Sequence, residues 1–376
     1  MRVGVLTTSY PRAPGDFAGW FVAERVRVLL EEGHEVDVLV GGAPLGTTRD
    51  GRLTLTRLPA RFGDTELFAG PGAPEVLEGP GLEAYWAAAR FSAALAAAVA
   101  ERASDWARIE SHWLAPCALA ALAGARRLPH RATAHSGDVA LLERLPFGRT
   151  LARLLARSGA ELVFVSEDLR RRFGALAGAA TGVVEPLSPA ATHDARGPRR
   201  DDPTRASMGL EGPTVVSVAR LVPIKGLDLL VRACAARAED AAALNVVIVG
   251  EGPERERLGE LAAHLGVSLR LVGAVAHDAV PAWLRLGDVY AQPSRTLTNG
   301  RAEGMPLATL EALSTRLPVV VSDSGGLAEL RASPHVQVVP AGDITSLGDA
   351  LRAALARGER RPSQRETSVQ GIVTSV

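Results

Sequence analysis

Two glutamates, Glu303 and Glu311, flank a short run that holds Pro306, and this spacing is the clearest sign of chemistry in the chain. Pro306 stands where a helix should begin, because proline is tolerated at the first helical position, where its missing N–H would have no partner. Glu303 is then predicted to lie in a loop before the helix, and Glu311 in its second turn. The N–H groups of Leu307 and Ala308 would lie between them, at the positive end of the helix dipole. The pattern predicts a phosphate site with one carboxylate on either side.

Two cations favour the same chemistry. Arg220 and Lys225 follow a predicted strand, 214–218, and precede a predicted helix that begins at Leu227. Arginine offers a planar fork to phosphate and lysine a point charge. A solvated basic loop is the ordinary explanation, but 41 of the 42 basic residues are arginine and Lys225 is the only lysine. Its place in this loop therefore favours phosphate binding.

The elements that must position these residues alternate regularly. Aliphatic runs alternate with helical patterns, which predicts parallel sheets covered by helices on both faces. The predicted strands of the first half are 3–8, 36–40, 107–111, 131–134 and 162–166, and those of the second half are 214–218, 245–249, 268–272, 289–292, 318–321 and 336–339. We expect an α/β protein with two doubly wound, Rossmann-like domains whose strand ends face a shared cleft.

Pro, Gly and dense mixed charge interrupt this pattern from about residue 185 to residue 213. Such a composition cannot build a core. We therefore predict a first domain over 1–190, a linker over 191–213 and a second domain over 214–357. A polar tail over 358–376, without a clear amphipathic helix, is predicted to be disordered.

The composition excludes several classes of protein. Lys+Arg and Asp+Glu are both 42, so no basic surface indicates nucleic-acid binding. Cys117 and Cys234 lie far apart and fit small buried side chains better than a metal or disulfide framework. No signal peptide is predicted, because the chain enters strand-like sequence at once. No membrane span is predicted either, because the longest apolar stretch, residues 84–100, carries Arg90 and fits a packed helix better. A cytoplasmic protein, at most peripherally attached to a membrane, is expected.

The ordered motifs of the second half resemble glycosyltransferase family 4, the retaining nucleotide-sugar enzymes known as glycosyl transferases group 1. The resemblance extends over residues 214–329. Its matches are Ala219-Arg220-Leu221 with Lys225-Gly226, Gly250-Glu251-Gly252-Pro253, Gln292-Pro293-Ser294, Glu303-Gly304-Met305-Pro306 through Glu311-Ala312, Pro318-Val319-Val320, and Gly325-Gly326 with Glu329. The family has the GT-B architecture, which is implied here.

The resemblance implies a role for each matching residue. Arg220 and Lys225 would neutralise the donor diphosphate, Glu303 would face the transferred hexose, and Glu311 would hold the ribose. The other donor contacts implied in the second half are Gly250, Val275, Gly304, Met305, Pro306 and Leu307.

The first half matches less closely. Gly19 would approach the donor phosphate, and His135, in Ala134-His135-Ser136-Gly137-Asp138, would face the hexose as a catalytic-site residue. Ser136 and Gly137 are swapped relative to the family's His-Gly-x-Asp. His112 and Asp138 are predicted acceptor contacts.

The implied activity moves a hexose from a UDP- or GDP-sugar to a hydroxyl of a small-molecule, lipid or glycan acceptor, with retention and without a metal or cofactor. In agreement, no Asp-x-Asp stands at a predicted strand end. An inverting GT-B enzyme and a non-catalytic nucleotide-sugar binder remain alternatives. A nicotinamide enzyme is disfavoured because no Gly-x-Gly-x-x-Gly follows the first strand.

Overall fold

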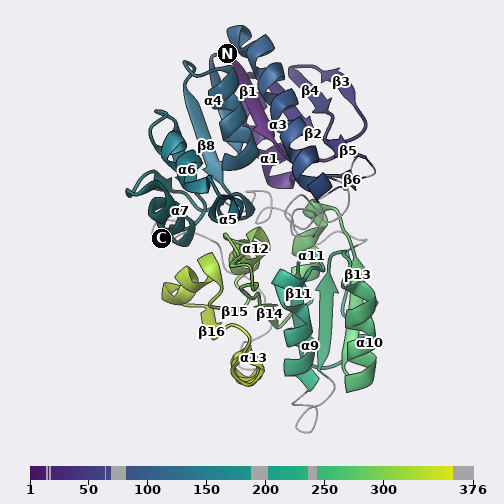
Figure 1. Cartoon of the computed structure of the whole chain (residues 1–376). Coiled ribbons are helices and arrows are strands. Elements are labelled where there is room, and N and C mark those ends of the chain that lie inside the picture. Colours follow the sequence, from purple (N-terminus) through teal and green to yellow (C-terminus); the bar gives the residue numbers. More distant parts are fainter. Residues whose placement is uncertain are drawn as a thin grey trace.

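The computed structural model describes residues 1–13, 16, 18–63, 65–68, 82–187, 202–235 and 244–358. These residues form two α/β domains, one above the other in Figure 1. Each domain is built around a mainly parallel sheet with helices on its faces. The prediction of two doubly wound, Rossmann-like domains is confirmed.

The first domain contains a sheet with the strand order β10-β9-β8-β7-β1-β2-β4-β3. Its strands are β1 (Arg2–Thr7), β2 (Glu35–Gly41), β3 (Gly46–Asp50), β4 (Leu53–Leu58), β7 (Arg108–His112), β8 (His130–Ala134), β9 (Glu161–Phe164) and β10 (Val183–Val184). All pairings are parallel except that of β3 with β4. The β3–β4 extension was not predicted, because β3 is fully exposed and carries no hydrophobic pattern.

Helices cover both faces of this sheet. They are α1 (Trp20–Glu31), α3 (Leu82–Arg102), α4 (Leu119–Gly124), α5 (Gly137–Arg144), α6 (Gly148–Ala156) and α7 (Glu167–Ala177), with a short η1 (Ala103–Asp105) and a π-helical turn η2 (Leu114–Ala118). A small hairpin, β5 (Arg61–Phe62) and β6 (Thr65–Glu66), lies beside α3. Gly19 precedes α1 with φ 67°, and a Cβ there would lie 2.1 Å from the carbonyl oxygen of Ser9. Only glycine fits this turn into α1.

The second domain contains an all-parallel sheet with the order β13-β12-β11-β14-β15-β16. Its strands are β11 (Thr214–Val218), β12 (Asn245–Val249), β13 (Ser268–Gly273), β14 (Val289–Gln292), β15 (Val319–Ser322) and β16 (Val336–Val339). Its helices are η3 (Pro223–Lys225), α9 (Leu227–Ala235), α10 (Arg255–Leu265), η5 (His277–Ala279), α11 (Val280–Leu284), α12 (Leu307–Ser314), η6 (Gly325–Ala332) and α13 (Ile344–Gly358). Four of the six strands begin and end where the sequence predicts.

The start of α12 differs by one residue from the prediction. Pro306 is the N-cap, with φ −64° and ψ 121°, and the helix begins at Leu307. Proline at this position still fixes φ, and the residue before the helix does not need a helical ψ. The first N–H groups of α12 are therefore those of Leu307 and Ala308, as expected. Glu311 lies in the second turn.

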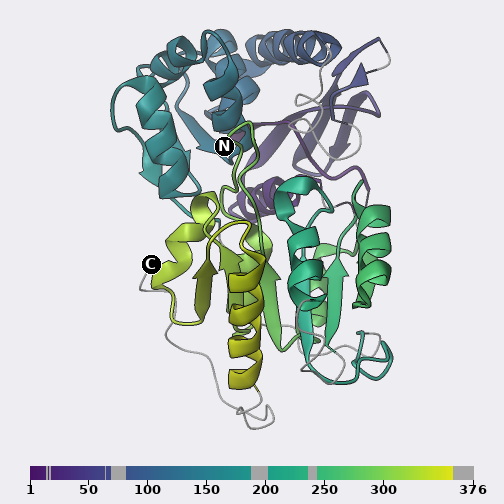
Figure 2. The ribbon, with the colours of Figure 1, turned by 60° about the horizontal axis from the view of Figure 1, so that its bottom comes forward.

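The two domains touch through backbone as well as side chains. One cluster of buried apolar residues includes members of both domains, such as Leu169 of α7 and Leu327 of η6. A Cβ on Gly304 would lie 2.3 Å from the carbonyl oxygen of His135. Glu329 accepts hydrogen bonds from the N–H groups of Glu167 (3.1 Å) and Asp168 (2.8 Å), and so caps the first turn of α7 from the other domain. Figure 2 shows the two domains in contact along this junction.

The predicted linker is described only in part, because residues 188–201 lie outside the described residues. Its end belongs to the second domain: Arg205 donates to the carbonyl of Leu286 and to Asp288, both at 3.0 Å. The tail from residue 359 onward is outside the described residues too. In the described part of the chain, no helix combines the length and apolarity that crossing a bilayer requires.

Candidate active site between the domains

A cavity of about 300 Å³ lies between the domains at the carboxyl ends of β1 and β11. Among the described residues its lining contains two carboxylates, Asp16 and Glu303, and a larger set of cations from both domains. These cations are Arg12, Arg57, Arg220, Lys225 and Arg301. Cations in such excess around a small, partly desolvated space favour an anionic ligand. We call this space the cleft cavity.

Lys225 and Glu303 meet directly in the cleft cavity. The Nζ of Lys225 lies 2.7 Å from Oε1 of Glu303, and both side chains are almost buried, at 13% and 10% exposure. The same oxygen accepts a hydrogen bond from Ser294 (3.0 Å), whose Oγ in turn accepts one from Gln292 (2.9 Å). This chain of hydrogen bonds extends from the end of β14 and fixes the Glu303 carboxylate. The sequence predicts both residues at the site, but not their ion pair.

The first domain contributes cations that the sequence analysis missed. Arg57, on β4, donates to the carbonyl of Pro11 (2.7 Å), and Arg12 donates to that of Phe68. Burial lowers the pKa of Arg57, and the nearby charge of Arg12 lowers it further. A bound anion would relieve both effects. In a chain with 41 arginines, no spacing distinguished these two from surface arginines.

The carbonyl of His135 abuts Gly304, next to Glu303, where the two domains meet. His135 is not among the residues that line the cleft cavity, so its predicted contact with the hexose stays a prediction. Its Nε2 lies 3.2 Å from Nδ1 of His112, and both rings are almost fully buried. Burial lowers the pKa of His112 to about 4, and burial with the neighbouring His112 lowers the pKa of His135 well below its usual range. Both imidazoles are therefore neutral at pH 7.

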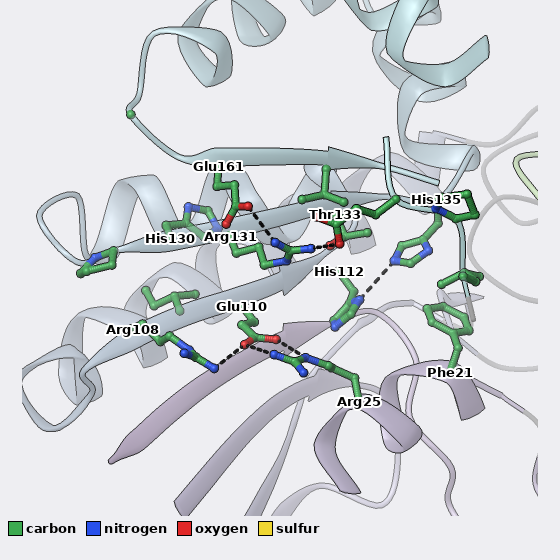
Figure 3. Close-up of a pocket in the computed structure, with 17 residues that line it drawn as sticks. Phe21, Arg25, Arg108, Glu110, His112, His130, Arg131, Thr133, His135 and Glu161 are labelled. Atoms are coloured by element: carbon green, nitrogen blue, oxygen red, sulfur yellow. Dashed lines mark hydrogen bonds and ion pairs between the residues drawn. The ribbon is translucent and has the colours of Figure 1, made fainter. Parts of the chain in front are cut away.

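The two histidines line the inner end of a different space, in the first domain, which we call the polar cavity (Figure 3). It has a volume of about 640 Å³ and runs along β7, β8 and β9. Its charges are matched. Glu110 pairs with Arg25 (2.8 Å) and Arg108 (3.0 Å), and Arg131 pairs with Glu161 and Glu185. Phe21 packs on His135 with ring centroids 4.6 Å apart.

Asp138 holds the loop that carries His135. Its carboxylate accepts hydrogen bonds from the N–H groups of His135 (3.2 Å), Ser136 (3.0 Å), Val139 (3.1 Å) and Leu114 (2.8 Å). Burial raises the pKa of Asp138, against the effect of these backbone bonds. The carboxylate thus positions His135 and η2, while the predicted acceptor contacts of Asp138 and His112 stay predictions.

Ser136 adopts φ 142° and ψ −58°, a region that residues other than glycine rarely adopt. The exchange of Ser136 and Gly137 relative to the family motif places the serine at this position, and Gly137 becomes the first residue of α5. Ser136 therefore introduces backbone strain into this loop. Trp113, at the end of β7, is a second strained residue, with φ 84°.

Glu311 is 2% exposed, and its Oε1 lies 2.6 Å from Nε2 of His277. His277 stacks on Trp20 of α1, with ring centroids 3.3 Å apart and planes at 11°. An element of the first domain thus covers the residue that the sequence predicts to hold the ribose. His277 was not predicted at the site, because it belongs to no motif that resembles the family. Trp20 ends a loop that does resemble the family's first loop, residues 11–20, but only Gly19 was predicted as a contact there.

The remaining predicted donor residues lie at different distances from the cleft cavity. Gly19 lines it. Gly304 adjoins Glu303, while Met305 and Pro306 are buried behind it and Leu307 is half-buried at the start of α12. Gly250 and Val275 do not line it. A Cβ on Gly250 would lie 1.9 Å from the carbonyl oxygen of Ala219, so packing alone requires glycine there.

Comparison with known proteins identifies the family. Residues 201–369 match the model of glycosyl transferases group 1, and residues 18–189 match that of a glycosyl transferase 4-like domain. A GDP-mannose-dependent alpha-(1-6)-phosphatidylinositol monomannoside mannosyltransferase from Mycobacterium tuberculosis is 37% identical over 269 residues, which are 67% of this chain and 68% of the relative. Its counterpart from Mycolicibacterium smegmatis is 35% identical over 273 residues, 66% and 70% of the two chains. The chain belongs to glycosyl transferases group 1 and is a nucleotide-sugar glycosyltransferase, as the motifs predict.

Solved structures show the same fold. A sucrose-phosphate synthase from Thermosynechococcus elongatus has a TM-score of 0.71 at 18% identity, covering 95% of this chain and 90% of that one. A trehalose-6-phosphate enzyme from E. coli bound with UDP-2-fluoro glucose has a TM-score of 0.70 at 16% identity, covering 96% and 94%. The fold is GT-B, as predicted. Within the described ranges, no group of three His, Cys, Asp or Glu side chains is arranged to hold a metal ion.

Proposed function

We propose that the protein transfers mannose from GDP-mannose to a hydroxyl of a glycan or glycolipid acceptor, with retention of anomeric configuration and without a metal. The cluster of cations around the cleft cavity carries this proposal, since a diphosphate is the anion that a nucleotide sugar brings there. The choice of GDP-mannose rests on the names of the two mycobacterial relatives.

In the proposed reaction the bond from C1 of the sugar to the diphosphate oxygen breaks, and the acceptor oxygen bonds to C1 on the same face. The acceptor proton passes to the leaving diphosphate. The protein then has two tasks, positioning and stabilising negative charge. Lys225 is suited to both, because an ammonium has three donors and can hold Glu303 and a phosphate oxygen together. Arg220 and the N–H groups of Leu307 and Ala308 add further stabilisation.

Glu303 would accept hydrogen bonds from hexose hydroxyls. His135, neutral at pH 7, offers an uncharged face beside the sugar, so that the positive charge of the site stays near the diphosphate. For Glu311 to bind the ribose, its contact with His277 would have to be shared or displaced.

The test is to incubate the protein with GDP-mannose, GDP-glucose and UDP-glucose, each with methyl α-mannoside, and to measure released nucleoside diphosphate and the anomeric configuration of the product. We expect release from GDP-mannose, an α-linked product and no effect of EDTA. A β-linked product would identify an inverting enzyme. If GDP-mannose stabilises the protein against heat but is turned over with none of several sugar acceptors, the protein is a nucleotide-sugar binder instead.

A further inference from the structure

A third cavity, of about 390 Å³, lies in the first domain and is lined by α3 on one side and by α5 and α6 on the other. Its size is within the range of small-molecule sites, about 300–1,000 Å³. It shares the walls Thr8, Phe68, Trp113 and Gly137 with the cleft cavity. The two spaces are therefore neighbours, separated by single side chains. We call this third space the apolar cavity.

The lining of the apolar cavity offers little to a polar ligand. It consists mainly of aliphatic and aromatic side chains, among them Leu119, Leu141 and Leu151. Two of its polar members are occupied elsewhere: the Ser92 hydroxyl donates to the carbonyl of Ala88 at 2.7 Å, and the Asp138 carboxylate accepts from four backbone N–H groups. None of the described lining residues is a Lys or Arg. A sugar or a phosphate alone would lose hydrogen bonds to water there without replacing them.

The rim of the apolar cavity is apolar and exposed as well. Tyr85 of α3 and Phe147, just before α6, line the cavity and are 38% and 57% exposed. Leu82, three residues before Tyr85 on α3, lies on the same face of this helix and is 75% exposed. Exposed large apolar side chains gathered around one opening indicate a surface that receives an apolar partner.

Trp113 stands at the junction of the apolar cavity and the cleft cavity. Its backbone is strained, and its indole Nε1 is buried with no hydrogen-bond partner among the described residues. A buried N–H without a partner costs about 1–3 kcal/mol and calls for an explanation. An acceptor whose polar head enters the cleft cavity would bring oxygen atoms to this place.

We propose that the apolar cavity binds the hydrocarbon chain of an amphiphilic acceptor, whose sugar head extends past Trp113 toward the donor. The proposal rests on the proposed function and narrows its acceptor to a lipid-linked sugar. Each methylene moved from water into such a cavity contributes about 0.8 kcal/mol, close to a fourfold gain in affinity.

The test uses GDP-mannose with methyl, butyl and octyl α-mannoside, the last below its critical micelle concentration. We expect the octyl compound to have a KM at least about tenfold below that of the methyl compound. Calorimetric titration of the same mannosides into the protein with GDP gives a readout that does not depend on turnover. Decyl and geranyl α-mannoside, whose chains have the same number of carbons, are compared as well: tighter binding of the geranyl compound indicates a prenyl-linked acceptor, and tighter binding of the decyl compound an acyl-linked one.

Two variants place the effect in the apolar cavity. Ala89→Phe fills it from α3, and Leu151→Gln makes its α6 wall polar; in both, the ratio of the octyl to the methyl affinity should fall toward one. Leu154→Gln is the matched control, because Leu154 is on α6, is 46% exposed and does not line the cavity. It should keep the ratio. If Ala89→Phe does not fold, the comparison of Leu151→Gln with Leu154→Gln still tests whether the apolar cavity binds the chain.

Equal affinity for methyl and octyl mannosides, in turnover and in titration, would overturn the inference while leaving the proposed function intact. So would equal effects of Leu151→Gln and Leu154→Gln, which would indicate only a general apolar surface. Absence of nucleotide release with every donor and acceptor would instead refute the proposed function, and the titrations would still report whether the chain is bound.

Discussion

The polar cavity and the cleft cavity lie on two sides of the His135 loop and differ in the balance of cations and carboxylates that line them. In the polar cavity Arg25, Arg108 and Arg131 each face a carboxylate within ion-pair distance. In the cleft cavity the described lining has an excess of cations from both domains. The larger space is thus lined by balanced charges, whereas the excess of cations in the smaller one favours an anionic ligand.

The largest expected effect separates the two cavities by activity. Lys225→Ala should lower kcat/KM for GDP-mannose by about 10²–10³, because one donor to the leaving group is lost. Arg108→Gln, a change of the same kind in the polar cavity, should leave kcat/KM within about twofold. Steady-state kinetics of the two variants measures the difference. Similar losses in both would contradict the division of roles.

Acidification should reveal the buried histidine pair, His112 and His135, at the inner end of the polar cavity. The folded pKa of His112 is about 4, below its unfolded value of about 6.5, so the unfolded chain takes up a proton first. The contribution of His112 to the free energy of unfolding is complete above pH 6.5 and is lost as the pH falls toward 4, by about 3 kcal/mol. Urea denaturation at several pH values measures this. His112→Gln should reduce the slope of the free energy of unfolding against pH by the equivalent of about one proton. An unchanged slope would refute the lowered pKa of His112.

The ion pairs of the polar cavity should stabilise the fold where they are buried. Glu110→Gln leaves Arg25 and Arg108 without their carboxylate, and we expect a loss of about 1–2 kcal/mol, since both arginines are partly exposed. Glu161→Gln is the matched control, because that carboxylate is 54% exposed and should contribute within about 0.5 kcal/mol. Both losses of stability are measured from the urea concentrations at the midpoints of unfolding, provided that the m-value does not change. Equal costs would show that burial does not set the strength of these pairs.

The smallest effect concerns the wall of the cleft cavity. Ser136→Gly should raise the free energy of unfolding by up to about 1 kcal/mol, because glycine adopts φ 142° without strain. Ser166→Gly, at a serine with ordinary extended backbone that caps α7, should lower it instead. A loss of stability in Ser136→Gly would mean that its side chain contributes more than its backbone costs.

The donor side of the site could be predicted from sequence because its residues are local. Arg220, Lys225, Glu303 and Glu311 lie in short loops or helix starts next to strands whose aliphatic runs are unmistakable. Arg57 and His277 could not be found in the same way. Arg57 is on a strand with alternating polar residues, and His277 gains its role only from contacts with Glu311 and Trp20 that the tertiary fold creates.

The same limit applies to the joint between the domains. Gly325, Gly326 and Glu329 match a family motif, but their spacing does not tell what they do. The structure gives the reason: Glu329 caps α7 of the other domain, and a Cβ on Gly326 would lie 2.8 Å from the Cβ of Ser166, which precedes α7. Such contacts between residues far apart in sequence cannot be derived from one chain alone.

The apolar cluster that includes members of both domains has a thermodynamic consequence. If the second domain unfolded alone, buried side chains of α7 would be exposed and the cap on its first turn would be lost. Neither half can then melt without destabilising the other, and we expect the described parts of both domains to unfold in one cooperative transition. A substitution that weakens one sheet should lower the melting temperature of the whole molecule, so the two Rossmann-like units behave as a single unit of stability.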